Sequence, residues 1–222
     1  MILILGCSFS LGWYSYDGVK ETPHTDYCWY DELEQSYHVY SHPSGGIMAY
    51  CGCLNDLDTK KYSAIIIQET WEPRIVIQEK IEYYAVRPNV WQWRIDNTFH
   101  NRLGGIPNLQ KKIAKKYNFE WQKGMNDWFW NIEQKHRGYN LLSEACASHL
   151  DYLAQQTGLP TYSYSFTGVK YPYKYIKYLD VKPATEQLFY KKDLHNPDLH
   201  FTRKGNTVLG QMIKKGLGDG LQ

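Results

Sequence analysis

Two short polar segments at opposite ends of the chain carry the residue types that nucleophilic catalysis requires. Near the N-terminus, Ser8 follows a short apolar run that ends at Gly6. A hydroxyl at such a turn could attack a carbonyl carbon, and the backbone N–H of the same residue could stabilise the developing oxyanion. A serine hydroxyl alone is a weak nucleophile and needs a positioned base. For this segment alone, the favoured interpretation is a small residue at a strand-to-helix turn.

The second segment contains a histidine with a carboxylate two residues before it. Asp198 and His200 lie in an expected loop just before the C-terminal helix. A carboxylate at this spacing could hold the imidazole in the tautomer that accepts a proton from a serine. For this segment alone, the favoured interpretation is a helix start with a solvated histidine. Together, the two segments predict a triad of Ser8, His200 and Asp198, provided that the fold brings the chain ends together.

Short apolar runs alternate with helical patterns and predict an α/β fold with a mainly parallel sheet. Strands are expected at residues 2–5, 37–40, 64–67 and 161–166. Helices are expected at residues 27–35, 47–57 and 139–157, and from Thr202 to about Gly216. The run at 64–67 is continuously apolar, which is typical of a central strand covered on both faces. Because ligands bind at the carboxyl ends of parallel strands, this architecture favours a site after the first strand.

The alternating pattern stops between about residues 71 and 137. We interpret this stretch as an insertion over the sheet, within a single domain that spans residues 1–222, and expect a helix after Pro107. The chain has 20 Tyr, 8 Trp and 7 Phe, and this stretch holds most of the tryptophans. Their rings could bind a carbohydrate or pack the insertion onto the sheet. The tryptophans concerned are Trp91, Trp93, Trp121, Trp128 and Trp130.

Composition and charge narrow the classes of partner. The 222 residues include 25 Lys plus Arg and 23 Asp plus Glu, so the formal net charge is +2. This balance gives no basic field for nucleic acid and no polybasic membrane patch. No phosphate-binding loop of the Gly-x-x-x-x-Gly-Lys-Ser/Thr or Gly-x-Gly-x-x-Gly type follows a strand. We therefore expect neither nucleic acid nor a membrane as a partner.

The N-terminal apolar run is too short for a signal peptide, and no stretch approaches the roughly 20 apolar residues of a membrane span. The five cysteines are odd in number and irregularly spaced, which argues against a disulfide framework. These features predict a cytoplasmic protein with reduced, structural thiols.

The residues around both segments resemble the SGNH (GDSL-type) hydrolase superfamily. The resemblance rests on Gly-Cys-Ser-Phe-Ser at residues 6–10 and on Asp-Leu-His-Phe-Thr-Arg-Lys-Gly-Asn at residues 198–206. The segment from Ile67 to Arg74 falls where the family's third block should be, and it resembles the Gln-Trp-Thr-Ser-Pro-x-Arg variant found in SGNH-like proteins encoded by bacteriophages. The resemblance implies a three-layer α/β/α sandwich of the SGNH/flavodoxin-like kind, without metal or cofactor. It further implies that Ser8 is the nucleophile and His200 the base.

The same resemblance implies an oxyanion hole. Gly45, after the second strand, matches the glycine of the family's second block, so its backbone N–H would act together with that of Ser8. The family's Gly-x-Asn-Asp block is absent from this chain. The Thr70 hydroxyl is the best substitute for the missing amide, and Gln68 is a weaker one. Loss of one such donor typically lowers kcat by about 10²–10³.

Two further positions depart from the family pattern. Cys7 stands where the first block has aspartate, a residue that is not the nucleophile. Pro197 stands where an Asp-x-x-His spacing would place aspartate, so Asp198 would serve from one residue closer.

The expected function is a serine esterase or deacetylase that acts on an acylated carbohydrate or another small ester. The main alternative is a non-catalytic SGNH-fold protein that serves in binding or as a component of a phage particle. In that case the aromatic insertion would mediate self-association or virion assembly, and the location would be the virion. A third interpretation treats His195, Asp198 and His200 as metal ligands.

Overall fold

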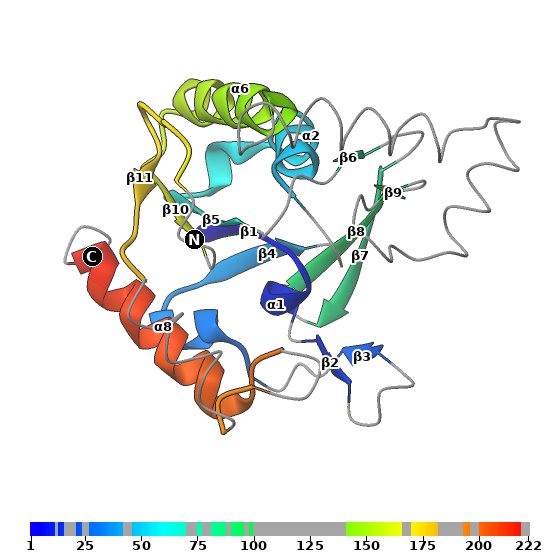
Figure 1. Cartoon of the computed structure of the whole chain (residues 1–222), viewed down its shortest axis with the longest axis vertical. Coiled ribbons are helices and arrows are strands. Elements are labelled where there is room, and N and C mark those ends of the chain that lie inside the picture. Colours follow the sequence, from blue (N-terminus) through cyan, green and yellow to red (C-terminus); the bar gives the residue numbers. More distant parts are fainter. Residues whose placement is uncertain are drawn as a thin grey trace, which may run out of the picture.

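The computed structural model describes residues 1–11, 13–15, 21–23, 27–41, 46–69, 75–76, 81–87, 90–95, 98–99, 141–165, 170–181, 193–195 and 200–218. The centre of the fold is a seven-stranded sheet with the order β11–β10–β5–β1–β4–β8–β7 (Figure 1). Neighbouring strands are parallel except for the antiparallel pair β7 and β8. The strands are β1 Ile2–Gly6, β4 Tyr37–Ser41, β5 Ala64–Glu69, β7 Ile81–Arg87, β8 Val90–Ile95, β10 Thr161–Ser165 and β11 Lys177–Tyr178. The predicted α/β fold with a mainly parallel sheet is confirmed.

The strand β1 lies between β4 and β5, so its carboxyl end is flanked on both sides. Leu5 pairs with Ile67 of β5, and Gly6 pairs with Ser41 of β4. The short helix α1, Ser8–Leu11, begins directly after this edge. The candidate nucleophile Ser8 therefore lies where parallel sheets bind ligands.

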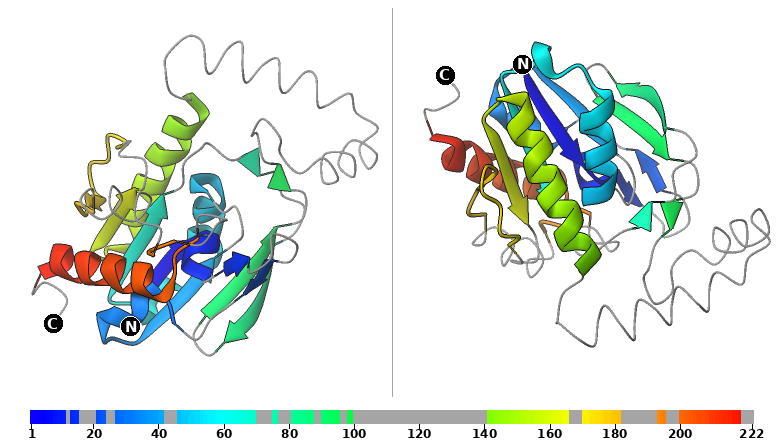
Figure 2. Two further views of the ribbon diagram at one scale, coloured as in Figure 1. Left: turned by 60° about the horizontal axis from the view of Figure 1, so that its bottom comes forward. Right: turned by 90° about the horizontal axis from the view of Figure 1, so that it is seen from above.

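Helices pack on both faces of the sheet (Figures 1 and 2). The apolar residues of β1 alternate between the faces, as the two-residue period of a strand requires. Leu3 and Leu5 belong to the hydrophobic cluster that includes α2, Ile47–Asp56, and α6, Leu141–Thr157. Ile2 and Ile4 belong to the cluster on the other face, formed with the 3₁₀ helix η1, Trp29–Leu33, and with α8, Arg203–Leu217. All four side chains are almost completely buried.

The expected helix at residues 27–35 is wrong in kind and length, because only the five-residue 3₁₀ helix η1 forms there. The Asp31 carboxylate accepts the backbone N–H of Cys28 at 2.6 Å, which satisfies a donor at the helix start. Glu34 then adopts a left-handed conformation with φ 55°, which ends the helix after its five residues. The helices α2, α6 and α8 agree with the expected ranges to within about two residues, whereas the short 3₁₀ helix η2, Thr59–Lys61, was not predicted.

Part of the expected insertion extends the sheet, which the sequence did not predict. The strands β7 and β8 form a hairpin whose β8 pairs with β4. The backbone of Trp91 lies opposite Tyr40 in this pairing, and Trp93 lies opposite Tyr83. Two small antiparallel pairs complete the described strands: β2 (Trp13–Ser15) with β3 (Glu21–Pro23), and β6 (Ile75–Val76) with β9 (Thr98–Phe99). The helix expected after Pro107 and the residues Trp121, Trp128 and Trp130 lie outside the described residues.

Within the described part of the chain, no helix has the length and apolar character needed to cross a membrane.

Candidate active site

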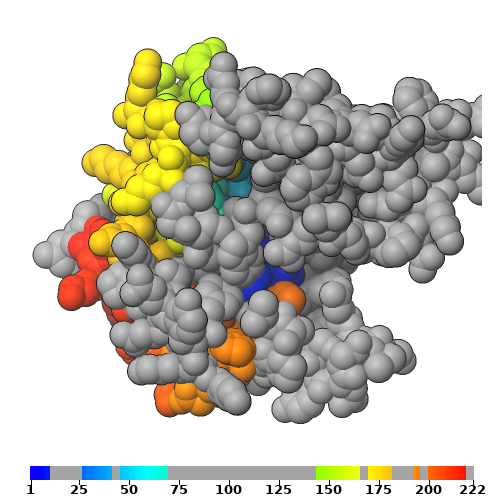
Figure 3. Space-filling view, viewed as in Figure 1, coloured from blue at the N-terminus to red at the C-terminus, as the bar shows by residue number. Residues whose placement is uncertain are grey.

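The structure brings the serine and the histidine from opposite ends of the chain into direct contact. Ser8 Oγ lies 2.8 Å from His200 Nε2, although the residues are 192 positions apart. Both side chains are half-buried. In the space-filling view, the blue N-terminal segment and an orange part of the C-terminal region come to the surface beside each other (Figure 3). This distance is that of a hydrogen bond, and it suits a proton transfer from hydroxyl to imidazole.

A tight turn presents Ser8. The backbone N–H of Ser10 donates to the Cys7 carbonyl at 3.0 Å, which closes the turn around Ser8. Gly6 is required just before it, because a Cβ at this position would lie 2.3 Å from Ser10 Cβ and Oγ. The turn therefore brings β1 and α1 closer together than a side chain at residue 6 would permit.

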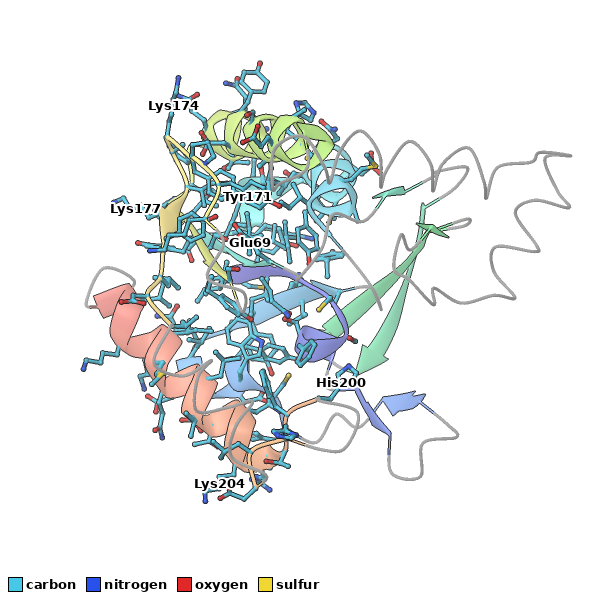
Figure 4. The ribbon with its side chains drawn as sticks, in the orientation of Figure 1. Glu69, Tyr171, Lys174, Lys177, His200 and Lys204 are labelled. Carbon is cyan, nitrogen blue, oxygen red and sulfur yellow. The ribbon has the colours of Figure 1, made fainter. Side chains whose placement is uncertain are left out.

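A second loop presents His200 (Figure 4). His195 and Phe201 form an isolated antiparallel bridge, and the Thr202 N–H donates to the Leu194 carbonyl at 3.0 Å. The Thr202 hydroxyl also accepts from Gly205 N at 3.2 Å, so it caps α8 as predicted. These contacts hold Phe201 and Thr202, which follow His200, against residues 194–195.

The imidazole packs against an aromatic ring that the N-terminal turn supplies. The ring centroids of Phe9 and His200 are 4.7 Å apart with an interplanar angle of 30°. Phe201 contacts the same Phe9 ring at 5.0 Å. Phe9 is nearly buried, so its ring provides a fixed apolar surface for the imidazole. Phe9, the residue that follows Ser8, thus also supports the imidazole of His200.

The amide of Gln68, the weaker candidate for an oxyanion donor, lies beneath the turn. Its Oε1 accepts from Ser10 Oγ at 2.5 Å, and its Nε2 donates to Cys7 Sγ at 3.1 Å. The side chain is fully buried. Gln68 is therefore engaged with the residues on either side of Ser8, and its interpretation as an oxyanion donor is wrong.

The remaining predicted site residues lie outside the described residues. These are Asp198, Gly45 and Thr70. Among the described residues, no group of three His, Cys, Asp or Glu side chains is arranged to hold a metal ion. Because Asp198 is not among them, the metal interpretation of His195, Asp198 and His200 stays a hypothesis.

Sequence reasoning missed a buried carboxylate at the same edge of the sheet. Glu69 ends β5 and is 1% exposed. Its carboxylate accepts from Ser163 Oγ at 2.7 Å and from the Tyr178 hydroxyl at 2.8 Å (Figure 4). Burial raises the pKa of Glu69 to about 7, although these two hydrogen bonds favour the charged form. The sequence signal was the polar pair Gln68–Glu69, which directly continues the most apolar strand of the chain.

No family model and no curated protein matches this chain.

Proposed function

We propose that this chain is a serine hydrolase of the SGNH type, an esterase or deacetylase. The observation that carries the proposal is the 2.8 Å contact between Ser8 Oγ and His200 Nε2. A nucleophile within hydrogen-bonding reach of its base is the arrangement that makes a serine hydroxyl reactive. The position of Ser8 after the carboxyl end of β1 adds support, because substrates reach parallel sheets at this edge.

The proposed reaction proceeds through an acyl-enzyme. His200 Nε2 accepts the hydroxyl proton as Ser8 Oγ bonds to the carbonyl carbon of an ester. The backbone N–H groups of Ser8 and Gly45, with the Thr70 hydroxyl, are the proposed donors to the oxyanion. The tetrahedral intermediate collapses, and His200 returns the proton to the leaving alcohol. A water molecule then attacks the acyl-enzyme with the same base, releasing the acid and restoring Ser8. Asp198 is the proposed partner that orients the imidazole.

The proposed substrate is an acylated carbohydrate or another small ester. The support is the tryptophan-rich composition of the middle of the chain, since aromatic rings pack well against sugar faces. Trp91 and Trp93 belong to β8, which pairs with the same β4 that flanks β1. No cofactor is needed for this chemistry.

Ester hydrolysis tests the proposal. Wild type should hydrolyse p-nitrophenyl acetate and release acetate from acetylated oligosaccharides. Ser8→Ala and His200→Gln should both reduce the rate to background, while Ser63→Ala, which changes an exposed serine at the opposite end of the sheet, should not. Activity that persists in Ser8→Ala would exclude Ser8 as the nucleophile.

The second candidate is a non-catalytic SGNH-fold protein that binds a partner or forms part of a phage particle. The absence of a Gly-x-Asn-Asp block favours it, because an active member would normally keep that side-chain amide. A folded wild type that hydrolyses no ester, and whose oligomeric state depends on the tryptophans of residues 91–130, would support this candidate.

A further inference from the structure

The amide of Gln68 contacts the turn on both sides of the nucleophile. Its Oε1 accepts from Ser10 Oγ at 2.5 Å and from the Cys7 backbone N–H at 3.4 Å. Its Nε2 donates to Cys7 Sγ at 3.1 Å. Cys7 precedes Ser8, and Ser10 follows it by two residues. One buried side chain from β5 therefore holds the turn that carries Ser8.

A second buried group, from η1, supports the same turn. Trp29 Nε1 donates to Ser10 Oγ at 3.2 Å. Trp29 is 0% exposed and belongs to η1, which packs against α8. Ser10 is thus a donor to Gln68 and an acceptor from Trp29, so its hydroxyl has a defined orientation. The three side chains form a continuous hydrogen-bonded chain from β5 to η1.

The local structure gives the turn little rigidity of its own. The helix α1 has only four residues, Ser8–Leu11, with no acidic residue in its first turn. Buried polar groups hold a unique geometry when each has a partner. If the Gln68 amide is removed, the Cys7 N–H and the Ser10 hydroxyl lose a buried acceptor. The turn would then relax, and Ser8 Oγ would move relative to His200.

We propose that Gln68 is a positioning residue that holds Ser8 Oγ within reach of His200 Nε2. The inference rests on the proposed hydrolase function, because positioning matters for a rate only if Ser8 reacts. Gln68 itself touches no substrate. The alternative is that its amide contributes to folding stability alone.

Enzyme kinetics separate these roles. Gln68→Met keeps the side-chain length but removes both hydrogen-bonding atoms. It should lower kcat about 10- to 100-fold with little change in KM, as expected for a displacement of about 1 Å. The matched control is Thr161→Val, which removes a buried hydroxyl that donates a part-buried hydrogen bond of 2.9 Å to the Leu159 carbonyl at the opposite end of the sheet. The control should lose stability and keep kcat. A Gln68→Met protein with wild-type kcat would overturn the inference while leaving the hydrolase function intact.

Ser10→Ala provides a second variant in case Gln68→Met does not fold. It removes the contact at 2.5 Å and leaves the contacts between Gln68 and Cys7. Its loss of kcat should be smaller, about 3- to 10-fold. In the double variant Gln68→Met/Ser10→Ala, the fold-decrease in kcat should be smaller than the product of the two single decreases, because both substitutions act on one turn. Wild-type kcat in Ser10→Ala, or fully multiplicative losses, would also overturn the inference.

A measurement without substrate distinguishes failure of this inference from failure of the proposed function. In ¹⁵N-histidine-labelled protein, Ser8→Ala should move the Nε2 resonance of His200 because it removes the 2.8 Å contact. In the Gln68→Met background the same substitution should move that resonance by less than half as much. Equal movement in both backgrounds would show that Gln68 does not position Ser8. Wild type without esterase activity would contradict the hydrolase proposal, and the resonance would still decide the role of Gln68.

Discussion

The ring of Phe9 packs on the imidazole of His200, with the ring centroids 4.7 Å apart. The residue beside Ser8 in sequence therefore supports the imidazole of His200, which comes from the other end of the chain. The position of His200 relative to Ser8 therefore depends on this ring contact as well as on the hydrogen bond between the two residues.

Replacing the Phe9 ring with an aliphatic side chain should make the orientation of the His200 imidazole less well defined. Phe9→Leu keeps an apolar side chain but removes the flat surface under His200, so we expect kcat for ester hydrolysis to fall about 10-fold. Phe9→Tyr should retain most of the rate, since it keeps the ring. Steady-state kinetics on both variants measures this effect. Equal rates for Phe9→Leu and wild type would show that the loop contacts alone orient His200.

The carboxylate that orients His200 should be Asp198. Asp198→Asn should lower kcat by about 10³–10⁴, because the amide favours the wrong imidazole tautomer. Asp193→Asn is the matched control. The Asp193 carboxylate pairs with Lys204 at 2.5 Å on the surface, where both side chains are more than half exposed. Such an exposed pair contributes little to stability. A similar loss of rate in both variants would contradict the assignment of Asp198.

The buried Glu69 should make the stability of the protein depend on pH. Burial raises the pKa of Glu69 from its ordinary value of 4.5 to about 7 in the folded protein. The folded state therefore holds this proton more tightly than the unfolded state does. The contribution of protonated Glu69 to the free energy of unfolding is fully present below about pH 4.5. It is lost as the pH rises through 7, which lowers the free energy of unfolding by up to about 3 kcal/mol.

Glu69→Gln should remove this decline, because the amide does not ionise. Urea unfolding of wild type and variant between pH 4.5 and pH 8.5 measures the difference in the free energy of unfolding. Glu34→Gln is the control, since the Glu34 side chain is 78% exposed, and it should keep the wild-type pH dependence. If Glu69→Gln instead destabilises the protein uniformly over this range, Glu69 is ionised throughout.

The turn before Ser8 should not tolerate a side chain at residue 6. A Cβ there would lie 2.3 Å from Ser10 Cβ, so Gly6→Ala should destabilise the fold by about 1–3 kcal/mol and reduce activity. Gly216→Ala is the comparison, because the nearest described atoms to its added Cβ would be those of the Leu179 side chain, at 3.4 Å or more. That helical position should gain stability by up to about 1 kcal/mol. Thermal unfolding of the two variants measures both effects, and a Gly6→Ala protein as stable as wild type would contradict the close packing of this turn.

The sequence predicted the central part of the fold because its strands are strongly apolar. The run Ala64–Ile67 indicated a buried central strand, and β5 does lie between β1 and β10. The ends of α8 were predicted to within one residue from Thr202 and Gly216, because residues that start and stop helices act locally. The strand β11 was not predicted, since Lys177–Tyr178 has only two residues and becomes a strand by pairing with β10. The hairpin β7–β8 was missed because its mixture of aromatic and charged residues has no clear alternation.

The candidate site was predictable where the signal was local. Ser8 and His200 could be chosen from their flanking residues, and the parallel sheet then accounts for their meeting. The roles of Gln68 and Phe9 could not be predicted, because they depend on which side chains meet across β5, α1 and the loop before α8. The high pKa of Glu69 likewise follows from burial, which depends on the packing of β10 and β11 around it.

Covalent labelling of Ser8 tests the proposed catalytic pair of Ser8 and His200 most directly. Purified wild type is treated with a fluorophosphonate probe, and intact-mass and peptide mass spectrometry locate the adduct. We expect one adduct, on the peptide that contains Ser8, with labelling abolished in Ser8→Ala and strongly slowed in His200→Gln. A folded wild type that gains no adduct, or an adduct that persists in Ser8→Ala, would contradict the proposal that Ser8 and His200 form a catalytic pair.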